Sequence, residues 1–349
     1  MGLLFSIGLD YDKCGSAVQL YYGGQYDHEI NNIDDDDDDD DDKHNDYSSY
    51  KTLTKIDHPP ITERPLFDLM LGSCNGLVCF FVPHDGMDDP IYICNPITGE
   101  YVNLPRFTCG KHASSHHKLV GGFGYLHSTN EYKVVRTYYD YDEPSLVGHV
   151  QVYTLGDGNG WRNKGDTTHF IGSSGVFANG YLHWIDIGAK KNIVAFDLAE
   201  EEFRLLPSPP CLLLRSRNLV YFSLQLLGGC LCVVCIDKGK CVDIWALKNK
   251  KKKKNSSYDD EDNSWSWSRE FSIAWEGPVR STFYEPFAVT KNNEVLLWFN
   301  GILSCYDPKT AILKKLWDDD TRFRYTKAIP HMNSLVSLKA LGEKSERRS

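Results

Sequence analysis

The sequence predicts an all-β protein that folds as a β-propeller. The main evidence is a group of short apolar segments, separated by turn residues, that recurs with a period of about 45–50 residues, as is typical of propeller blades. The composition agrees, because 13% of the 349 residues are aromatic and 41% are hydrophobic, and aromatic side chains favour strands over helices. A chain of this length can form one large propeller domain.

The repeating unit is clearest where an Asn-Gly pair precedes an apolar run. Asn75-Gly76 predicts a two-residue hairpin turn, because both residue types accept the positive φ that such turns require. The apolar runs at residues 77–81 and 91–94 have the length and composition of strands. Pro96 ends the second run, because proline donates no backbone hydrogen bond. Residues 100–104 alternate polar and apolar side chains and predict a third strand.

Four further copies of this unit follow along the chain. They cover residues 122–161, 175–207, 228–247 and 292–317. Two N-terminal strands, at residues 3–9 and 16–22, and a C-terminal strand within residues 325–338 supply a sixth blade. Pairing the two ends of the chain in one blade closes the ring and removes its open edge. We therefore predict six blades, closed by the N-terminal and C-terminal strands.

One propeller domain is predicted over residues 1–338, followed by a polar tail at residues 339–349 that we expect to be frayed. Nine consecutive aspartates at residues 34–42 belong to an acidic loop at residues 34–46. Their mutual repulsion favours a solvated loop over a calcium site, which needs spaced ligands and a central glycine. We interpret the lysine-rich insertion at residues 248–263 as a lengthened surface loop, with a nuclear-import or polyanion-binding patch as the alternative.

Charge and cysteine content limit the partners and the compartment. The formal charge is −10, so the chain has no overall basic field of the kind that binds nucleic acid. No apolar run approaches the length of a membrane span. Eleven cysteines, with no secretory signal before them, favour reduced thiols and a cytoplasmic or nuclear location. The first six residues also fit the loose myristoylation pattern, but a strand explains residues 3–9 better.

One segment offers a candidate contact surface for a partner protein. Tyr138, Tyr139 and Tyr141 belong to an aromatic, acidic connection at residues 138–144. Tyrosine provides a large contact area at a low entropic cost, and loops often carry binding residues. The alternative interpretation is the end of an ordinary tyrosine-rich strand.

A histidine cluster raises the possibility of a metal site. His112, His116, His117 and His127 lie close together in the sequence. Apart from Cys109, however, carboxylate and cysteine ligands at the spacing of a zinc site are missing. We therefore predict no metal at this cluster.

The remaining signs of chemistry are also incomplete. Cys230 and Cys232 would lie on one face of a strand and Cys235 on the other, so the three thiols do not converge on a metal. Gly122-Phe123-Gly124 lacks the third glycine of a dinucleotide-binding loop, and no Gly-x-Ser-x-Gly nucleophile motif occurs. The sequence predicts no catalytic residue and no cofactor, and hence a protein that is not an enzyme.

Several motifs resemble those of the plant F-box-associated domain. They are Gly-Ser-Cys-Asn-Gly-Leu-Val-Cys from residue 72, Asn-Pro-Ile-Thr-Gly-Glu from residue 95, Gly-Phe-Gly-Tyr from residue 122, Gly-Val-Phe-Ala-Asn-Gly-Tyr-Leu-His-Trp from residue 175 and Ser-Leu-Val-Ser-Leu from residue 334. The motifs follow one another in order over residues 72–338, so the resemblance is specific. It implies a kelch-like β-propeller.

The resemblance also implies a function. Proteins of this family carry an N-terminal F-box that binds the Skp adaptor of a cullin-based ubiquitin ligase, and the associated domain holds the target. No F-box is found ahead of the first predicted strand, so Skp and cullin are expected as partners only if an F-box lies upstream. The alternatives are an F-box-less propeller that binds a target without ubiquitin transfer, and a kelch-like enzyme or sugar-binding module.

Overall fold

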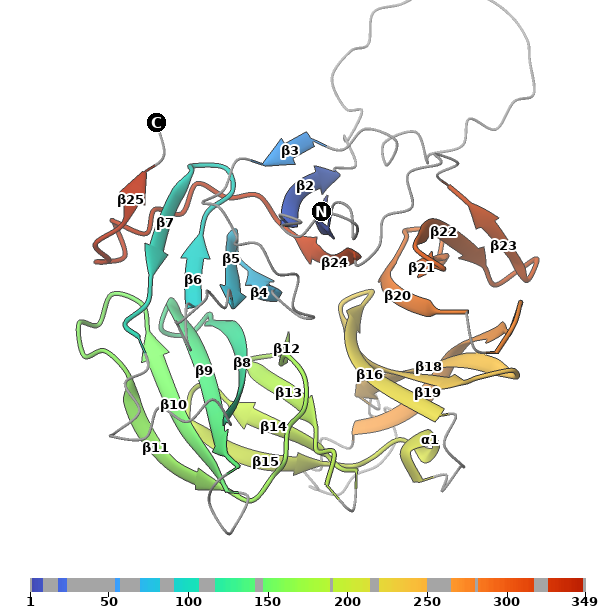
Figure 1. Cartoon of the computed structure of the whole chain (residues 1–349), viewed down its shortest axis with the longest axis horizontal. Coiled ribbons are helices and arrows are strands. Elements are labelled where there is room, and N and C mark those ends of the chain that lie inside the picture. Colours follow the sequence, from blue (N-terminus) through green and yellow to red (C-terminus); the bar gives the residue numbers. More distant parts are fainter. Residues whose placement is uncertain are drawn as a thin grey trace, which may run out of the picture.

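In the computed structural model the strands form six antiparallel sheets arranged in a ring (Figure 1). The structure describes residues 2–8, 18–23, 54–56, 70–81, 91–106, 117–141, 147–188, 191–213, 220–249, 265–279, 282–316 and 326–347. The acidic loop, the lysine-rich insertion beyond Asn249, and the residues Cys109, His112 and His116 lie outside these ranges. Each sheet is one blade, and the prediction of a six-bladed β-propeller is confirmed.

Five blades are formed from consecutive segments of the chain. The first contains β4 (Met70–Cys74), β5 (Leu77–Phe81), β6 (Ile91–Cys94) and β7 (Glu100–Asn103). The second contains β8 (His117–Leu126), β9 (Glu131–Asp140), β10 (Gly148–Thr154) and β11 (Arg162–Thr167). The third contains β12 (Val176–Ala178), β13 (Tyr181–Ile185), β14 (Ile193–Asp197) and β15 (Glu202–Leu206).

The short helix α1 (Pro210–Leu213) follows the third blade. The fourth blade contains β16 (Val220–Leu227), β17 (Cys230–Asp237), β18 (Cys241–Asn249) and β19 (Trp265–Ala274). The fifth contains β20 (Tyr284–Val289), β21 (Val295–Phe299), β22 (Ile302–Asp307) and β23 (Ile312–Lys315). In each of these five blades the first strand along the chain is the innermost one, as the contacts between neighbouring blades show.

The sixth blade joins the two ends of the chain. Its innermost strand is β24 (Thr326–His331), and its outer strands are β1 (Gly2–Gly8), β2 (Val18–Gly23) and β3 (Thr54–Ile56). β1 is antiparallel to β24, with Gly2 opposite His331 and Ile7 opposite Thr326. The predicted closure is thereby confirmed, and Figure 1 shows the N-terminal strands beside β24.

The polar tail does not fray as expected over the described residues. The two-residue strand β25 (Glu346–Arg347) pairs with β7 and gives the first blade a fifth strand. Before it, the Glu343 carboxylate accepts hydrogen bonds from the Tyr153 hydroxyl at 3.1 Å and from the Gly156 amide at 2.8 Å. The polarity of the tail does not reveal these contacts, because their partners are more than 180 residues away in the chain.

The hydrophobic core is divided into six clusters, one between each pair of neighbouring blades. Each blade buries both of its faces, so successive residues of one strand belong to different clusters. Leu297 packs with the fourth blade, whereas Leu296 and Trp298 pack with the sixth. Burial on both faces explains why strands such as β5 and β14 are continuous apolar runs in the sequence rather than alternating ones.

Candidate partner-binding surface

The strand order divides the loops between two rims of the ring. Neighbouring innermost strands are parallel, as β4 and β24 show: Met70 lies beside Lys327, and Ser73 lies beside His331. In the five blades formed from consecutive segments, the turns between first and second strands and between third and fourth strands therefore lie on one rim, which we call the turn rim. The connections between second and third strands, and the crossings to the next blade, lie on the opposite rim, which we call the loop rim.

The turn rim is partly covered by the chain itself. At the predicted hairpin turn, Asn75 and Gly76 have φ of 44° and 87°, as a tight turn of this kind requires. A Cβ atom at Gly76 would collide with Ser334, which belongs to the segment that follows β24. The Asn95 side-chain amide donates hydrogen bonds to the backbone carbonyl oxygens of Ser334 at 3.0 Å and Val336 at 2.7 Å. The C-terminal segment is thereby fastened across the first blade on this rim.

The loop rim also exposes large apolar side chains. Their exposed fractions are 51% for Tyr141, 48% for Ile187, 53% for Tyr221, 37% for Val279 and 61% for Phe283. They come from four consecutive blades or from the connections that enter them. Exposed apolar side chains that gather on one side of a protein are typical of interaction surfaces.

The structure separates the three tyrosines that the sequence predicts as partner contacts. Tyr139 is fully buried; its hydroxyl donates to the His169 carbonyl at 2.7 Å and accepts from the Ile171 amide at 3.0 Å. The prediction is therefore wrong for Tyr139, a core residue between the second and third blades, because β9 continues through this position. Tyr138 is half-buried and Tyr141 is exposed. Partner contact through these two residues stays a prediction.

A group of cations and aromatic rings lies on the loop rim across the third, fourth and fifth blades. Lys238 Nζ is 4.8 Å from the ring centroid of Tyr221 and 5.0 Å from that of Phe283. Lys191 Nζ is 5.2 Å from the ring centroid of Phe222. We call these five residues the cation–aromatic row. The sequence analysis did not find it; its signal is the pair of aromatic residues, Tyr221 and Phe222, at the start of β16.

The backbone under this row is held firmly. The Phe283 amide donates to Asn300 Oδ1 at 2.9 Å, and the Asn300 amide donates to the Phe283 carbonyl at 3.1 Å. Asn300 lies in the turn between β21 and β22 with a φ of 52°. Because both backbone groups of Phe283 are bound, its exposed ring projects from a fixed position.

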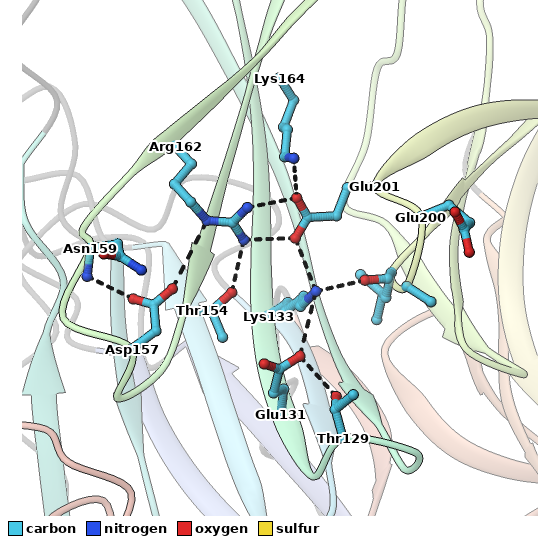
Figure 2. A network of polar contacts seen from close by, with 12 residues as sticks. Thr129, Glu131, Lys133, Thr154, Asp157, Asn159, Arg162, Lys164, Glu200 and Glu201 are labelled. Carbon is cyan, nitrogen blue, oxygen red and sulfur yellow. Dashed lines mark hydrogen bonds and ion pairs between the residues drawn. The ribbon is translucent and has the colours of Figure 1, made fainter.

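The densest polar cluster joins the second and third blades near the turn rim (Figure 2). The Glu201 carboxylate accepts hydrogen bonds from Lys133 at 2.9 Å and from Arg162 at 2.6 and 2.8 Å, and it pairs with Lys164 at 2.5 Å. Lys133 also donates to the Leu198 carbonyl at 2.8 Å. Burial alone would raise the pKa of Glu201, but the hydrogen bonds from the three cations outweigh it and lower the pKa to about 2.

This cluster fastens two blades together and does not have the features of a catalytic centre. A carboxyl with a pKa near 2 stays ionised at neutral pH, so Glu201 cannot act there as a general acid. A cleft of about 420 Å³ adjoins the cluster, and its lining includes Lys164, His169 and Glu202. His169 lies 3.0 Å from Asp186 and is held by that contact.

The described residues contain no group of three His, Cys, Asp or Glu side chains placed to hold a metal ion. The predicted separation of the cysteines on β17 is confirmed. Cys230 and Cys232 face the fifth blade, and Cys235 faces the third. Within the same part of the chain, no helix has the length and apolar character needed to cross a membrane.

Comparison with known proteins identifies relatives over most of the chain. Residues 40–329 match the F-box associated beta propeller domain. The F-box protein At3g07870 of Arabidopsis thaliana is 29% identical, over 72% of this chain and 66% of that protein. The F-box/kelch-repeat protein At3g23880 of the same plant is 28% identical, over 68% of this chain and 60% of that protein. F-box protein CPR1, also from Arabidopsis thaliana, is 25% identical, over 73% of this chain and 66% of that protein.

A solved structure of the SapL1 lectin in complex with alpha methyl fucoside covers 83% of this chain and 88% of its own, with 8% identity and a TM-score of 0.41. This similarity is too distant to inform function.

The chain spans less than two thirds of the length of the three Arabidopsis relatives. The family match covers five complete blades and reaches into the sixth. This chain belongs to the family of F-box associated beta propeller domains.

Proposed function

We propose that this chain is the target-recognition part of a Skp–cullin–F-box ubiquitin ligase receptor. In this role it binds a target protein and performs no catalysis itself, since ubiquitin transfer takes place on other subunits. The observation that carries the proposal is the membership of the F-box associated family, together with similarity to several F-box proteins. The exposed apolar side chains of the loop rim provide a surface for a target.

The positions of the chain ends support different roles for the two rims. Gly2 is opposite His331, which places the start of β1 on the turn rim. In a longer chain with an F-box before β1, the Skp adaptor and the cullin would approach from this rim. The loop rim then points away from the ligase and is the side on which a target can bind.

We also propose that the chain works in the cytoplasm or the nucleus. The nine cysteines that the structure describes are free thiols, and most of them are buried. Burial raises the pKa of Cys94 to about 12, so this thiol stays protonated and inert. Buried, unpaired thiols are compatible with a reducing compartment and support this location.

The proposal can be tested by recovering partners from Arabidopsis cells. Two tagged proteins are compared after inhibition of the proteasome and chemical cross-linking: this chain alone, and this chain preceded by the N-terminal segment of F-box protein At3g07870. We expect both to recover the same target protein, and only the longer one to recover the Skp adaptor and a cullin and to shorten the lifetime of the target.

Two other outcomes would change the conclusion. A target that the longer protein binds but whose lifetime does not change would favour the alternative of a propeller that binds without ubiquitin transfer. If neither protein recovers a target above the level seen with an unrelated propeller, target recognition by this chain is excluded.

A further inference from the structure

We propose that the cation–aromatic row binds an acidic, extended segment of the target protein, through the carboxylates of the segment and one of its apolar side chains. This inference deepens the target-recognition role proposed above and rests on it. The row consists of Lys191, Phe222, Tyr221, Lys238 and Phe283, and it crosses three blades of the loop rim.

The row is continuous because of the geometry of β16. Successive side chains of a strand point to opposite faces of the sheet, so the neighbours Tyr221 and Phe222 reach towards different blades. Phe222 packs in the core cluster shared with the third blade, beneath Lys191. Tyr221 lies on the other side, where Lys238 bridges it to Phe283 of the fifth blade. A ligand lying along the row would therefore meet one cation, two rings, a second cation and a third ring.

The two lysines of the row carry positive charge that the described part of the chain does not neutralise. Some lysines elsewhere pair with carboxylates: Lys133 and Lys164 with Glu201, and Lys248 with Glu270. Neither Lys191 nor Lys238 forms an ion pair with a described carboxylate. An aromatic ring attracts an ammonium group and limits its motion without removing its charge. On a chain with a net charge of −10, the row is thus a basic site on an acidic protein.

The acidic residue next to Lys238 in the sequence has another partner. Asp237, at the end of β17, is paired with Lys240 at 3.1 Å. Among the described residues the row holds two lysines and no arginine, and so small a site suits a few carboxylates of a peptide better than the long phosphate backbone of a nucleic acid.

The apolar part of the row requires an apolar group from the ligand. Phe283 and Tyr221 are 61% and 53% exposed, and Val279 adds a further exposed side chain beside the turn at Gly239. Since the backbone of Phe283 is held by Asn300, little backbone entropy is lost when its ring is covered. An extended segment that places an aromatic or aliphatic side chain next to aspartate or glutamate matches both parts of the row.

The experiment uses the full chain and a phage-displayed library of random 12-residue peptides. We expect the selected peptides to be enriched in Asp and Glu next to an apolar residue. The affinity of one selected peptide is then measured by fluorescence anisotropy. Lys238→Glu and Phe283→Ala should each weaken binding by at least about tenfold, as substitutions at the centre of an interface do. The Lys238→Glu chain should in turn gain affinity for a peptide whose acidic residues are replaced by lysine.

Matched controls lie on the turn rim. Lys309 is an exposed lysine between β22 and β23, and Leu335 is 81% exposed after β24. Lys309→Glu and Leu335→Ala should change the affinity by less than about twofold, as expected for surface positions away from the site. Thermal unfolding of each variant verifies that the propeller is intact.

The outcomes separate this inference from the proposed function. Selected peptides without acidic enrichment, or an affinity that Lys238→Glu leaves unchanged, would overturn the acidic-segment proposal. If a Lys238→Glu, Phe283→Ala chain also still captures the cellular target, target recognition stands and takes place elsewhere on the surface. If the wild-type chain selects no peptide and captures no target, both proposals fall.

Discussion

At the scale of single residues, Glu201 lies in a turn of the third blade and binds three cations of the second. The turn after β6 runs from Asn95 to Gly99, whose amide donates to the Asn95 carbonyl at 3.0 Å. The turn after β14 has the same hydrogen bond, since the Glu201 backbone amide donates to the Asp197 carbonyl at 2.8 Å. Gly99 has a φ of 70° and Glu201 one of 58°, and a residue with a Cβ atom is strained there by about 1 kcal/mol. The three cations around the carboxylate offset this cost.

The first prediction concerns this carboxylate. Glu201→Gln should lower the free energy of unfolding by about 3 kcal/mol, because it leaves Lys133, whose side chain is only 7% exposed, with the more distant and more exposed Glu131 as its charged partner. Urea unfolding followed by tryptophan fluorescence measures the change. The neighbouring Glu202→Gln is the control, since Glu202 is exposed and should alter stability by less than about 0.5 kcal/mol. Equal effects of the two substitutions would show that the cluster does not stabilise the fold.

The second prediction compares two glycines at equivalent turns. Gly76 and Gly180 have similar φ, 87° and 83°, so an alanine is strained by about 1 kcal/mol at either position. At Gly180 the new Cβ meets no other atom within 4 Å, whereas at Gly76 it collides with Ser334. Gly76→Ala should therefore lower the urea midpoint further than Gly180→Ala. Similar midpoints for the two variants would mean that the C-terminal segment is not fastened to this turn.

At the scale of the strands, burial decides which elements can be predicted from the sequence. The middle strands bury both faces, so β5, β14 and β21 are apolar runs that the sequence analysis located. The outermost β11, with the sequence Arg-Asn-Lys-Gly-Asp-Thr, is mostly exposed and shows no apolar signal. The innermost β20 was also missed, because Pro286 lies at an irregularity in its pairing with β21.

The same reasoning explains the candidate surface. Tyr141 could be named from the sequence, because a tyrosine beside acidic residues after a strand is a local signal. The cation–aromatic row could not, because Lys191, Lys238 and Phe283 belong to three different blades and come to one surface only when these consecutive blades pack together. Tyr139 was misplaced for the opposite reason: β9 extends through it to Asp140, so a residue expected in a loop lies in the core.

The third prediction concerns the innermost strand of the closing blade. His331 on β24 is 1% exposed, its Nδ1 lies 2.8 Å from the Ser73 hydroxyl, and burial lowers its pKa to about 4. An unfolded histidine has a pKa of about 6.5, so between these two values only the unfolded chain binds the proton. Stability should therefore fall as the pH drops from about 6.5 towards 4.

The buried His183 behaves in the same way, since burial lowers its pKa to about 4. His331→Gln should remove only the part of the pH-dependent loss of stability that His331 causes. In a chain that also carries His183→Gln, most of the remaining pH dependence of stability should disappear. Unfolding free energies from urea titrations at pH 7.5 and pH 5 measure the difference. A pH dependence that is unchanged in the double variant would show that these histidines do not set it.

At the scale of the whole molecule, the ring depends on a segment before the start of the family match. That match begins at residue 40, but β1 and β2 supply two of the four strands in the closing blade. Leu4 and Leu20 pack against the first blade, and Phe5 packs against the fifth. Together with β24, the N-terminal strands thus join the fifth blade to the first.

The fourth prediction follows from this arrangement. A chain that lacks residues 2–23 leaves β24 without its partner and uncovers the rings of Phe287 and Trp298, which lie 6.2 and 6.0 Å from that of Phe5. Loss of one buried phenylalanine costs about 3–5 kcal/mol, so the shortened chain should unfold at a much lower urea concentration and bind a hydrophobic dye. A synthetic peptide of residues 2–23, added separately, should restore the midpoint and displace the dye.

The peptide experiment distinguishes closure of the ring from a general effect of shortening the chain. A peptide with Phe5→Ala should restore little, because it retains the backbone pairing with β24 but loses the ring contacts with the fifth blade. A peptide of scrambled sequence should restore nothing. If the shortened chain instead unfolds at the wild-type urea midpoint, then five blades and β24 form a stable ring alone, and the N-terminal strands are not needed to close it.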